Sequence, residues 1–94
     1  MNKYETVIII TNRITKEQKN NVITKVTNLI SKNGKITEIK DLGERKLAYE
    51  IKKQKQAFFY DIFFEASPEF IAELERIYRI TDEILKFIVV RQND

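Results

Sequence analysis

The stretch AFFYDIFFEASPEF, residues 57–70, combines the pattern of a strand with the first turn of a helix. Successive residues of an extended chain point to opposite faces, so Phe59 and Phe63 share one face. The other face carries the larger apolar set Phe58, Tyr60, Ile62 and Phe64. The triplet Ser-Pro-Glu at 67–69 then supplies a hydroxyl cap, a proline for the first turn and an acid at the positive end of the helix dipole. The sequence therefore predicts a strand over 57–66 that leads directly into a helix.

Similar patterns extend outward in both directions along the chain. Apolar extended runs predict strands at 4–11 and 84–91, and a long charged segment at 36–52 predicts a third. Thr15 and Gln18 form a capping-box pattern at the start of a helix over 16–32, and we expect Gly34 to end that helix in a left-handed conformation. A polar hairpin loop is expected at 53–56, and a turn is expected at 81–83.

The order strand, helix, strand, strand, helix, strand repeats one half-pattern twice. Right-handed crossovers place both helices on one face of one antiparallel sheet, so the predicted fold class is α+β, a ferredoxin-like split βαβ sandwich with four strands. We expect a single domain over residues 1–94 with a short polar tail at 92–94. The first and last strands are apolar on both faces and are expected to be inner strands, with the charged second strand at an edge. Val7, Ile9, Phe59 and Phe63 would then lie on a sheet face that has no helix over it, which usually indicates a binding partner.

The composition excludes much chemistry. The chain has no cysteine and no histidine, so it has no thiol nucleophile, no disulfide and no typical zinc site. It contains no phosphate-binding glycine motif and no apolar run long enough to span a bilayer. We therefore expect no catalytic residue, no metal, no cofactor, no small-molecule substrate and no membrane partner. The net charge of +3 and the pI near 9.2 are compatible with nucleic-acid binding without being specific for it.

The segment LGERKLAYEIKK, residues 42–53, changes the parity of its apolar residues at Gly43. A strand does this only with an extra residue, so we expect a bulge at this glycine, which re-aims Arg45 and Lys46 beside an exposed edge. These two residues are then either edge-strand gatekeepers or contacts to RNA or a partner. A ring of lysines at 52, 53 and 55 surrounds the hairpin tip, which is usually a solubility feature and sometimes a flexible phosphate contact.

The same segment resembles the signature of the bacterial small-subunit ribosomal protein S-six family. KYE at 3–5 is similar to the start of that family's sequences, and RITDEILKFIVVR at 79–91 is similar to their end. The resemblance covers essentially the whole chain. It implies the same split βαβ fold and a non-enzymatic role on the cytoplasmic ribosome. It also implies binding to 16S ribosomal RNA, in the central domain of the small subunit, together with a second small protein, ribosomal protein S-eighteen. The chain departs from the family at Lys46, where arginine is common, and lysine keeps the charge without the bidentate fork.

Two sets of site residues follow as expectations. The RNA-binding set contacts phosphates and consists of Lys3, Arg45, Lys46, Arg79, Lys86 and Arg91. The partner-protein interface consists of Leu42, Gly43, Leu47, Tyr49, Phe59 and Phe63. Two other classes stay open on the residues alone: a stand-alone RNA-recognition module that stacks bases on Phe59, and a small-molecule regulatory domain that dimerises through its sheets.

Overall fold

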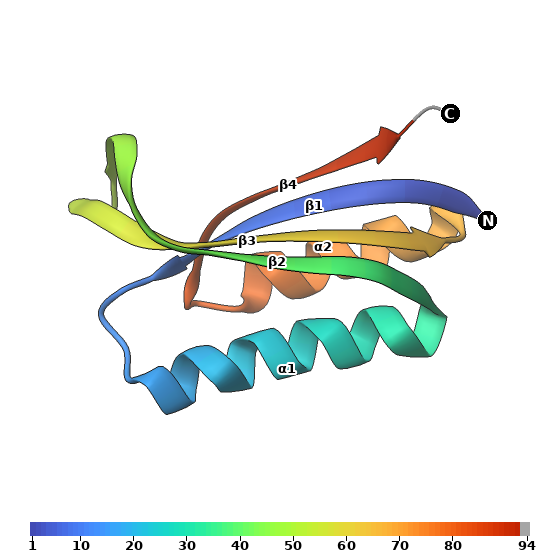
Figure 1. The fold of residues 1–94 in the computed structure, drawn as a ribbon, viewed down its shortest axis with the longest axis horizontal. Helices are drawn as coiled ribbons and strands as arrows, with labels where there is room; N and C mark the ends of the chain where they lie inside the picture. Colours follow the sequence, from blue (N-terminus) through green and yellow to red (C-terminus); the bar gives the residue numbers. More distant parts are fainter. Residues whose placement is uncertain (93–94) are drawn as a thin grey trace.

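A four-stranded antiparallel sheet with two helices packed on one of its faces makes up the fold (Figure 1). The structure is a computed structural model that describes residues 1–92. The elements in chain order are β1 (Asn2–Thr11), α1 (Lys16–Asn33), β2 (Gly34–Ile51), β3 (Gln54–Ala66), α2 (Pro68–Ile80) and β4 (Ile84–Gln92). The strand order is β2-β3-β1-β4. The predicted ferredoxin-like sandwich is therefore confirmed.

The core lies between the helices and the even-numbered residues of β1 and β3. Ile8, Ile62 and Phe64 have almost no exposed surface. The helices cover them with the buried residues Val22, Val26, Ile30, Phe70, Leu74 and Tyr78. Each large apolar side chain buried in this way stabilises the fold by roughly 1.5–3 kcal/mol. The buried faces of the two helices thus form the core with the sheet.

One polar contact crosses this core. Thr6 is fully buried, its hydroxyl donates to the Ile88 carbonyl over 2.9 Å, and it lies 3.1 Å from the hydroxyl of Tyr78. Burial raises the pKa of Tyr78, so this hydroxyl stays neutral. The pair ties α2 to the two strands beneath it.

The two helices begin differently from one another. The capping box predicted for α1 is confirmed, because Thr15 Oγ1 accepts from the Gln18 amide and Gln18 Oε1 accepts from the Thr15 amide. Ser67 occupies the cap position of α2, but its hydroxyl makes no capping bond. The Phe70 amide donates instead to the Ser67 carbonyl over 3.1 Å.

Gly34 does not end α1 in a left-handed conformation, contrary to the prediction. Its φ of −172° is extended backbone, and it is the first residue of β2. Glycine is required here because there is no room for a side chain: a Cβ built at this position would lie 2.0 Å from the Glu65 carbonyl oxygen on β3. The chain therefore leaves the helix at a point of close contact between two backbones.

The expected place of β4 is wrong. It is an edge strand, and β3 is the inner strand beside β1. On one face of β4, Phe87 packs on Tyr78 with ring centroids 5.0 Å apart, while Ile88 and Val90 on the other face are about half exposed. An edge strand whose outer apolar face is uncovered has the same sequence pattern as a buried central strand. Gln92, assigned to the tail, ends β4, and residues 93–94 lie outside the described residues.

The bulge predicted near Gly43 is confirmed. Gly43 has φ +75°, the register to β3 shifts between Asp41 and Gly43, and Asp41 Oδ1 accepts from the Gly43 amide over 2.9 Å. A second shift, between Ile36 and Glu38, was not expected. Up to Lys46, two extra residues restore the original parity, so Leu47 comes to lie on the sheet face opposite to that of Ile36. A third shift follows between Lys46 and Ile51.

The turn after β2 is shorter than predicted. Ile51 pairs with Gln54, so the loop consists of Lys52 and Lys53 alone and not of residues 53–56. Both lysines have positive φ, as a type I′ turn requires.

Candidate partner and nucleic-acid interface

The sheet face that carries no helix presents a row of apolar side chains. They come from odd-numbered positions of β1 and β3 and from even-numbered positions of β4, and they are Val7, Ile9, Phe59, Phe63, Ile88 and Val90. Ile88 and Val90 are 49% and 46% exposed. We call this surface the open face. Three neighbouring strands, β3, β1 and β4, contribute to it, so it is continuous across most of the sheet.

Beyond Gly43, β2 curves over the end of the open face and encloses a hollow of about 270 Å³. Leu47, Tyr49 and Ile51 form one wall. The floor consists of the open-face residues Val7, Ile9, Phe59 and Ile88. Leu47 is buried at 9% exposure although no helix covers it, whereas Tyr49 is 61% exposed. The hollow is thus apolar inside, with an accessible aromatic ring at its rim.

Lys86 also lines the hollow. Its ammonium group lies 5.1 Å from the centre of the Tyr49 ring and donates to the Tyr49 hydroxyl. Further along the open face, the Lys40 ammonium group lies 5.1 Å from the centre of the Phe63 ring. Cations placed in this way are attracted to the ring faces. The rings of Tyr49 and Phe63 therefore each have a lysine beside them.

The predicted partner-interface residues fall into three places. Leu47, Tyr49 and Phe59 come together at the hollow, and Phe63 lies on the same face nearer the end of β3. Leu42 and Gly43 form the bulge, where both are half-buried. Sequence reasoning missed Ile51 and Ile88, because placing them at the hollow depends on the register of β2 and β4.

The predicted RNA-binding residues do not form one patch. By register, Lys3, Arg45 and Lys86 lie on the open side of the sheet, and Lys46 and Arg91 lie on the helix side. The Arg45 Nε donates to the Leu42 carbonyl over 3.0 Å, which holds the guanidinium group at the bulge. The Arg91 side chain donates to Asn2 Oδ1 over 3.3 Å.

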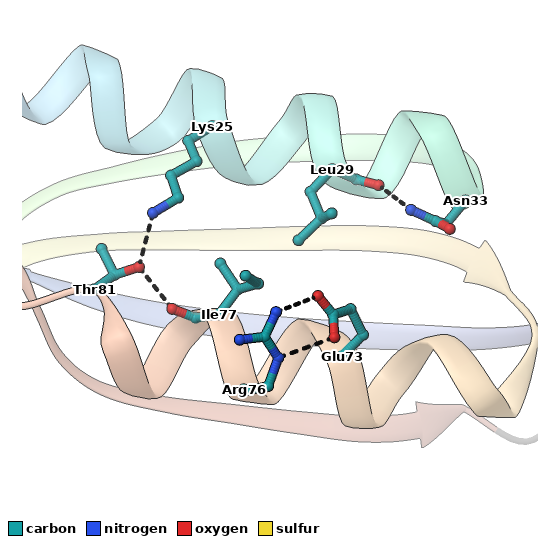
Figure 2. A network of polar contacts seen from close by, with 7 residues as sticks. All are labelled: Lys25, Leu29, Asn33, Glu73, Arg76, Ile77 and Thr81. Carbon is teal, nitrogen blue, oxygen red and sulfur yellow. Dashed lines mark hydrogen bonds and ion pairs between the residues drawn. The ribbon is translucent and has the colours of Figure 1, made fainter.

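Arg79, the sixth member of this set, is on α2, where basic groups have local partners. Arg79 lies 3.7 Å from the Glu75 carboxylate and packs over the Phe87 ring. Figure 2 shows the neighbouring pair, in which Arg76 donates to Glu73 through two nitrogens, and also Lys25 of α1 donating to the Thr81 hydroxyl. Both arginines of α2 are thus paired with acids of their own helix.

A carboxylate pair in the middle of the open face has no counterpart in the sequence analysis. Asp61 pairs with Val7 across β1 and β3, which places it diagonally next to Glu5. Burial, and then hydrogen bonding and repulsion from Glu5, raise the pKa of Asp61 from 3.8 to about 6, against a smaller opposing effect of Lys40. Within residues 1–92, Asp61 Oδ1 is buried without a hydrogen-bond partner. Two acids beside Phe59 and Phe63 disfavour a phosphate at this point.

Among residues 1–92, no group of three or more acidic, cysteine or histidine side chains is arranged to hold a metal ion. No helix in that range is long and apolar enough to cross a membrane.

Comparison with known proteins identifies the family. Residues 3–91 match the family model described as ribosomal protein S6. The chain belongs to the ribosomal protein S6 family. It is therefore a structural, non-enzymatic component of the small ribosomal subunit, and it acts on the ribosome in the cytoplasm. The family that its three sequence motifs resemble is thus confirmed.

Individual relatives agree with this assignment. Small ribosomal subunit protein bS6 of Caldanaerobacter subterraneus is 37% identical over 95 residues, which cover all of both chains. The bS6 protein of Helicobacter acinonychis is 42% identical over 97% of this chain, which spans 65% of that longer relative. The crystal structure of ribosomal protein S6 from Thermotoga maritima superposes with a TM-score of 0.92 at 33% identity, over 97% of this chain and 87% of that one. A hydroxynitrile lyase from Passiflora edulis, at a TM-score of 0.51 and 13% identity, shares the fold alone.

Proposed function

We propose that the chain binds 16S ribosomal RNA in the central domain of the small subunit jointly with ribosomal protein S-eighteen. In this proposal the open face docks the protein partner, and exposed basic side chains hold RNA phosphates. The observation that carries it is an uncovered apolar sheet face with a hollow at one end, in a member of a ribosomal protein family.

The chemistry of the open face favours a protein partner there. Its centre is apolar and aromatic, as in the core of a protein–protein interface. A base that stacked on Phe63 would have to displace Lys40, and its phosphate would approach Asp61 and Glu5. A protein side chain entering the hollow meets Leu47 and Phe59 without that repulsion. The Tyr49 ring, exposed although Lys86 lies beside it, is a suitable anchor, because tyrosines are often the residues that carry interface energy.

Basic residues around this face supply the RNA contacts in the proposal. Arg45 and Lys46 are exposed on the strand beside the bulge, and Lys86 stands at the rim of the hollow. Lysine and arginine on phosphates position RNA without reading its sequence. Since only a few phosphates are contacted, the affinity of the chain alone is expected to be weak, and the partner is expected to raise it.

The test is a titration of a 16S central-domain fragment with the chain alone and then with ribosomal protein S-eighteen. Tight binding without the partner, with no gain when the partner is added, would refute joint binding. It would favour the stand-alone RNA module, in which Phe59→Ala abolishes binding.

A pair of variants tests the open face. Tyr49→Ala removes an exposed ring at the hollow and is expected to weaken the partner-dependent step about tenfold or more. Ile80→Ala is the matched control, because Ile80 is 60% exposed on α2, away from the open face. Equal effects of the two variants would contradict docking at the hollow. A stable homodimer that the Tyr49 variant dissociates would mean that a second copy, and not ribosomal protein S-eighteen, occupies this face.

A further inference from the structure

The net charge of the chain is concentrated in one hairpin. Residues 44–56, the end of β2 and the start of β3, contain five basic and two acidic side chains, an excess of three. The whole chain has 17 basic and 14 acidic residues, the same excess. The other residues therefore contain twelve of each sign and are neutral together. The mild basicity of this protein is a property of this hairpin, not of its surface as a whole.

The basic side chains of the hairpin face solvent. Arg45, Lys46, Lys52, Lys53 and Lys55 are all exposed. Within residues 1–92, none of them forms an ion pair, in contrast to the arginines of α2. Figure 1 shows the hairpin, in green and yellow, bending away from the helix layer at one end of the sheet. Its charges are thus presented together to a partner approaching from that end.

The turn itself has an unusual composition. Lys52 and Lys53 have φ values of 50° and 63°. Two-residue turns with positive φ at both positions are usually Asn-Gly or Asp-Gly, because side chains with a branched or long stem are strained there. Two lysines at these positions adopt an unfavourable backbone conformation. They also place two positive charges at the tip of the hairpin. Strain of this kind is a reason to look for a function.

Contacts with Thr11, the last residue of β1, and with Arg13 just after it hold the tip in place. Arg13 donates to the Lys53 carbonyl over 3.0 Å. Thr11 donates to Gln54 Oε1 over 2.7 Å, and both of these side chains are buried. The lysines therefore project from an anchored turn, which lowers the entropy lost when they bind.

We propose that this hairpin is the main phosphate-contacting element of the chain, with Lys52, Lys53 and Lys55 on the RNA backbone. The proposal rests on the RNA-binding function proposed above, and it adds residues that lie outside the contact set predicted from the sequence. RNA is favoured over a protein as the occupant because the tip, KKQKQ at 52–56, has no apolar side chain, and lysine is depleted from protein–protein interfaces. Phosphates need only the positive charge that lysines supply.

The test uses a double substitution that removes charge without damaging the turn. Lys52→Asn with Lys53→Gly installs the preferred type I′ pair, so this variant is expected to unfold at the same temperature as the wild type or higher. The control, Lys32→Gln with Lys35→Gln, removes the same charge from the last turn of α1 and the start of β2, where both lysines are exposed. Binding of each variant to the 16S central-domain fragment, with ribosomal protein S-eighteen present, is measured across a series of KCl concentrations.

The expected result is a shallower salt dependence for the hairpin variant. Losing two phosphate contacts lowers the slope of log K against log salt by roughly 1.4–1.8, whereas the control slope stays at the wild-type value. An unchanged slope in the hairpin variant, or an equal drop in the control, would overturn this inference and leave the proposed function standing. Failure of the wild type to bind RNA even with the partner would overturn both.

Discussion

Replacing Asp61 by asparagine is expected to stabilise the protein at neutral pH and to leave its stability unchanged in acid. Asp61 lies in the middle of the open face beside Glu5, with Oδ1 buried and without a hydrogen-bond partner among residues 1–92. Asparagine keeps the shape, removes the charge and adds an N–H group that is able to donate to the Glu5 carboxylate. The change therefore relieves both the burial of a charge and the repulsion between the two acids.

The size of the effect follows from the pKa of Asp61, which rises from 3.8 to about 6 on folding. Below pH 3.8 the carboxyl is protonated in both states and contributes nothing. Between pH 3.8 and 6 the unfolded chain releases the proton first, so stability falls as the pH rises, and above pH 6 the loss is complete. A rise of about two in the pKa corresponds to a loss of roughly 3 kcal/mol in the free energy of unfolding. Since the side chain is partly exposed, solvent screening reduces this to about 1–2 kcal/mol.

Urea unfolding of Asp61→Asn and of the wild type at pH 3.5 and pH 7.5 measures this difference. The variant is expected to be more stable by about 1–2 kcal/mol at pH 7.5 and equal to the wild type at pH 3.5. Asp82→Asn is the control, because Asp82 is exposed in the turn before β4. The reasoning is wrong if the variant and the wild type differ by the same amount at both pH values, or if the variant is the less stable protein at pH 7.5.

Three further substitutions test the packing of the fold by thermal or urea denaturation. Gly34→Ala is expected to cost about 3 kcal/mol, because its Cβ would meet the Glu65 carbonyl oxygen at 2.0 Å; a loss below 1 kcal/mol would contradict the close backbone contact. Gly43→Ala has open space around the new Cβ and is expected to cost only about 1–2 kcal/mol, from its positive φ. A greater loss of stability in Gly43→Ala than in Gly34→Ala would contradict this reasoning. Tyr78→Phe removes the hydroxyl that contacts buried Thr6 and is expected to lower the stability by about 0.5–1.5 kcal/mol. An unchanged stability would mean that this hydroxyl contact does not stabilise the fold.

The periodicity of the sequence was sufficient to predict the element order and the core. Helical spacing and the Thr15 capping box placed α1, and alternation in β3 assigned Phe59 and Phe63 to the open face. The place of β4 was not predictable in this way. Ile88 and Val90 are apolar because they lie on a face that we propose is covered by a partner, and the chain alone does not distinguish that from burial inside the sheet.

The candidate site was harder to predict because it depends on register. A glycine at position 43 indicates one bulge in the sequence. The extra residue between Ile36 and Glu38 is not a glycine, so the sequence does not indicate that bulge. Without that second shift, Leu47 and Tyr49 would be assigned to the wrong face of β2. The acid pair of Asp61 and Glu5 arises in the same way, from the pairing of two strands that are far apart in sequence.

The edge position of β4 has a consequence for the protein before it reaches the ribosome. From Lys86 to Gln92 this strand pairs with β1 without a bulge, so its outer edge offers an uninterrupted row of backbone donors and acceptors next to exposed Ile88 and Val90. Such an edge is a template for pairing with another copy of the chain. Lys86 and Arg91 are the charges on that strand, and we expect them to keep newly made chains soluble until a partner covers the open face.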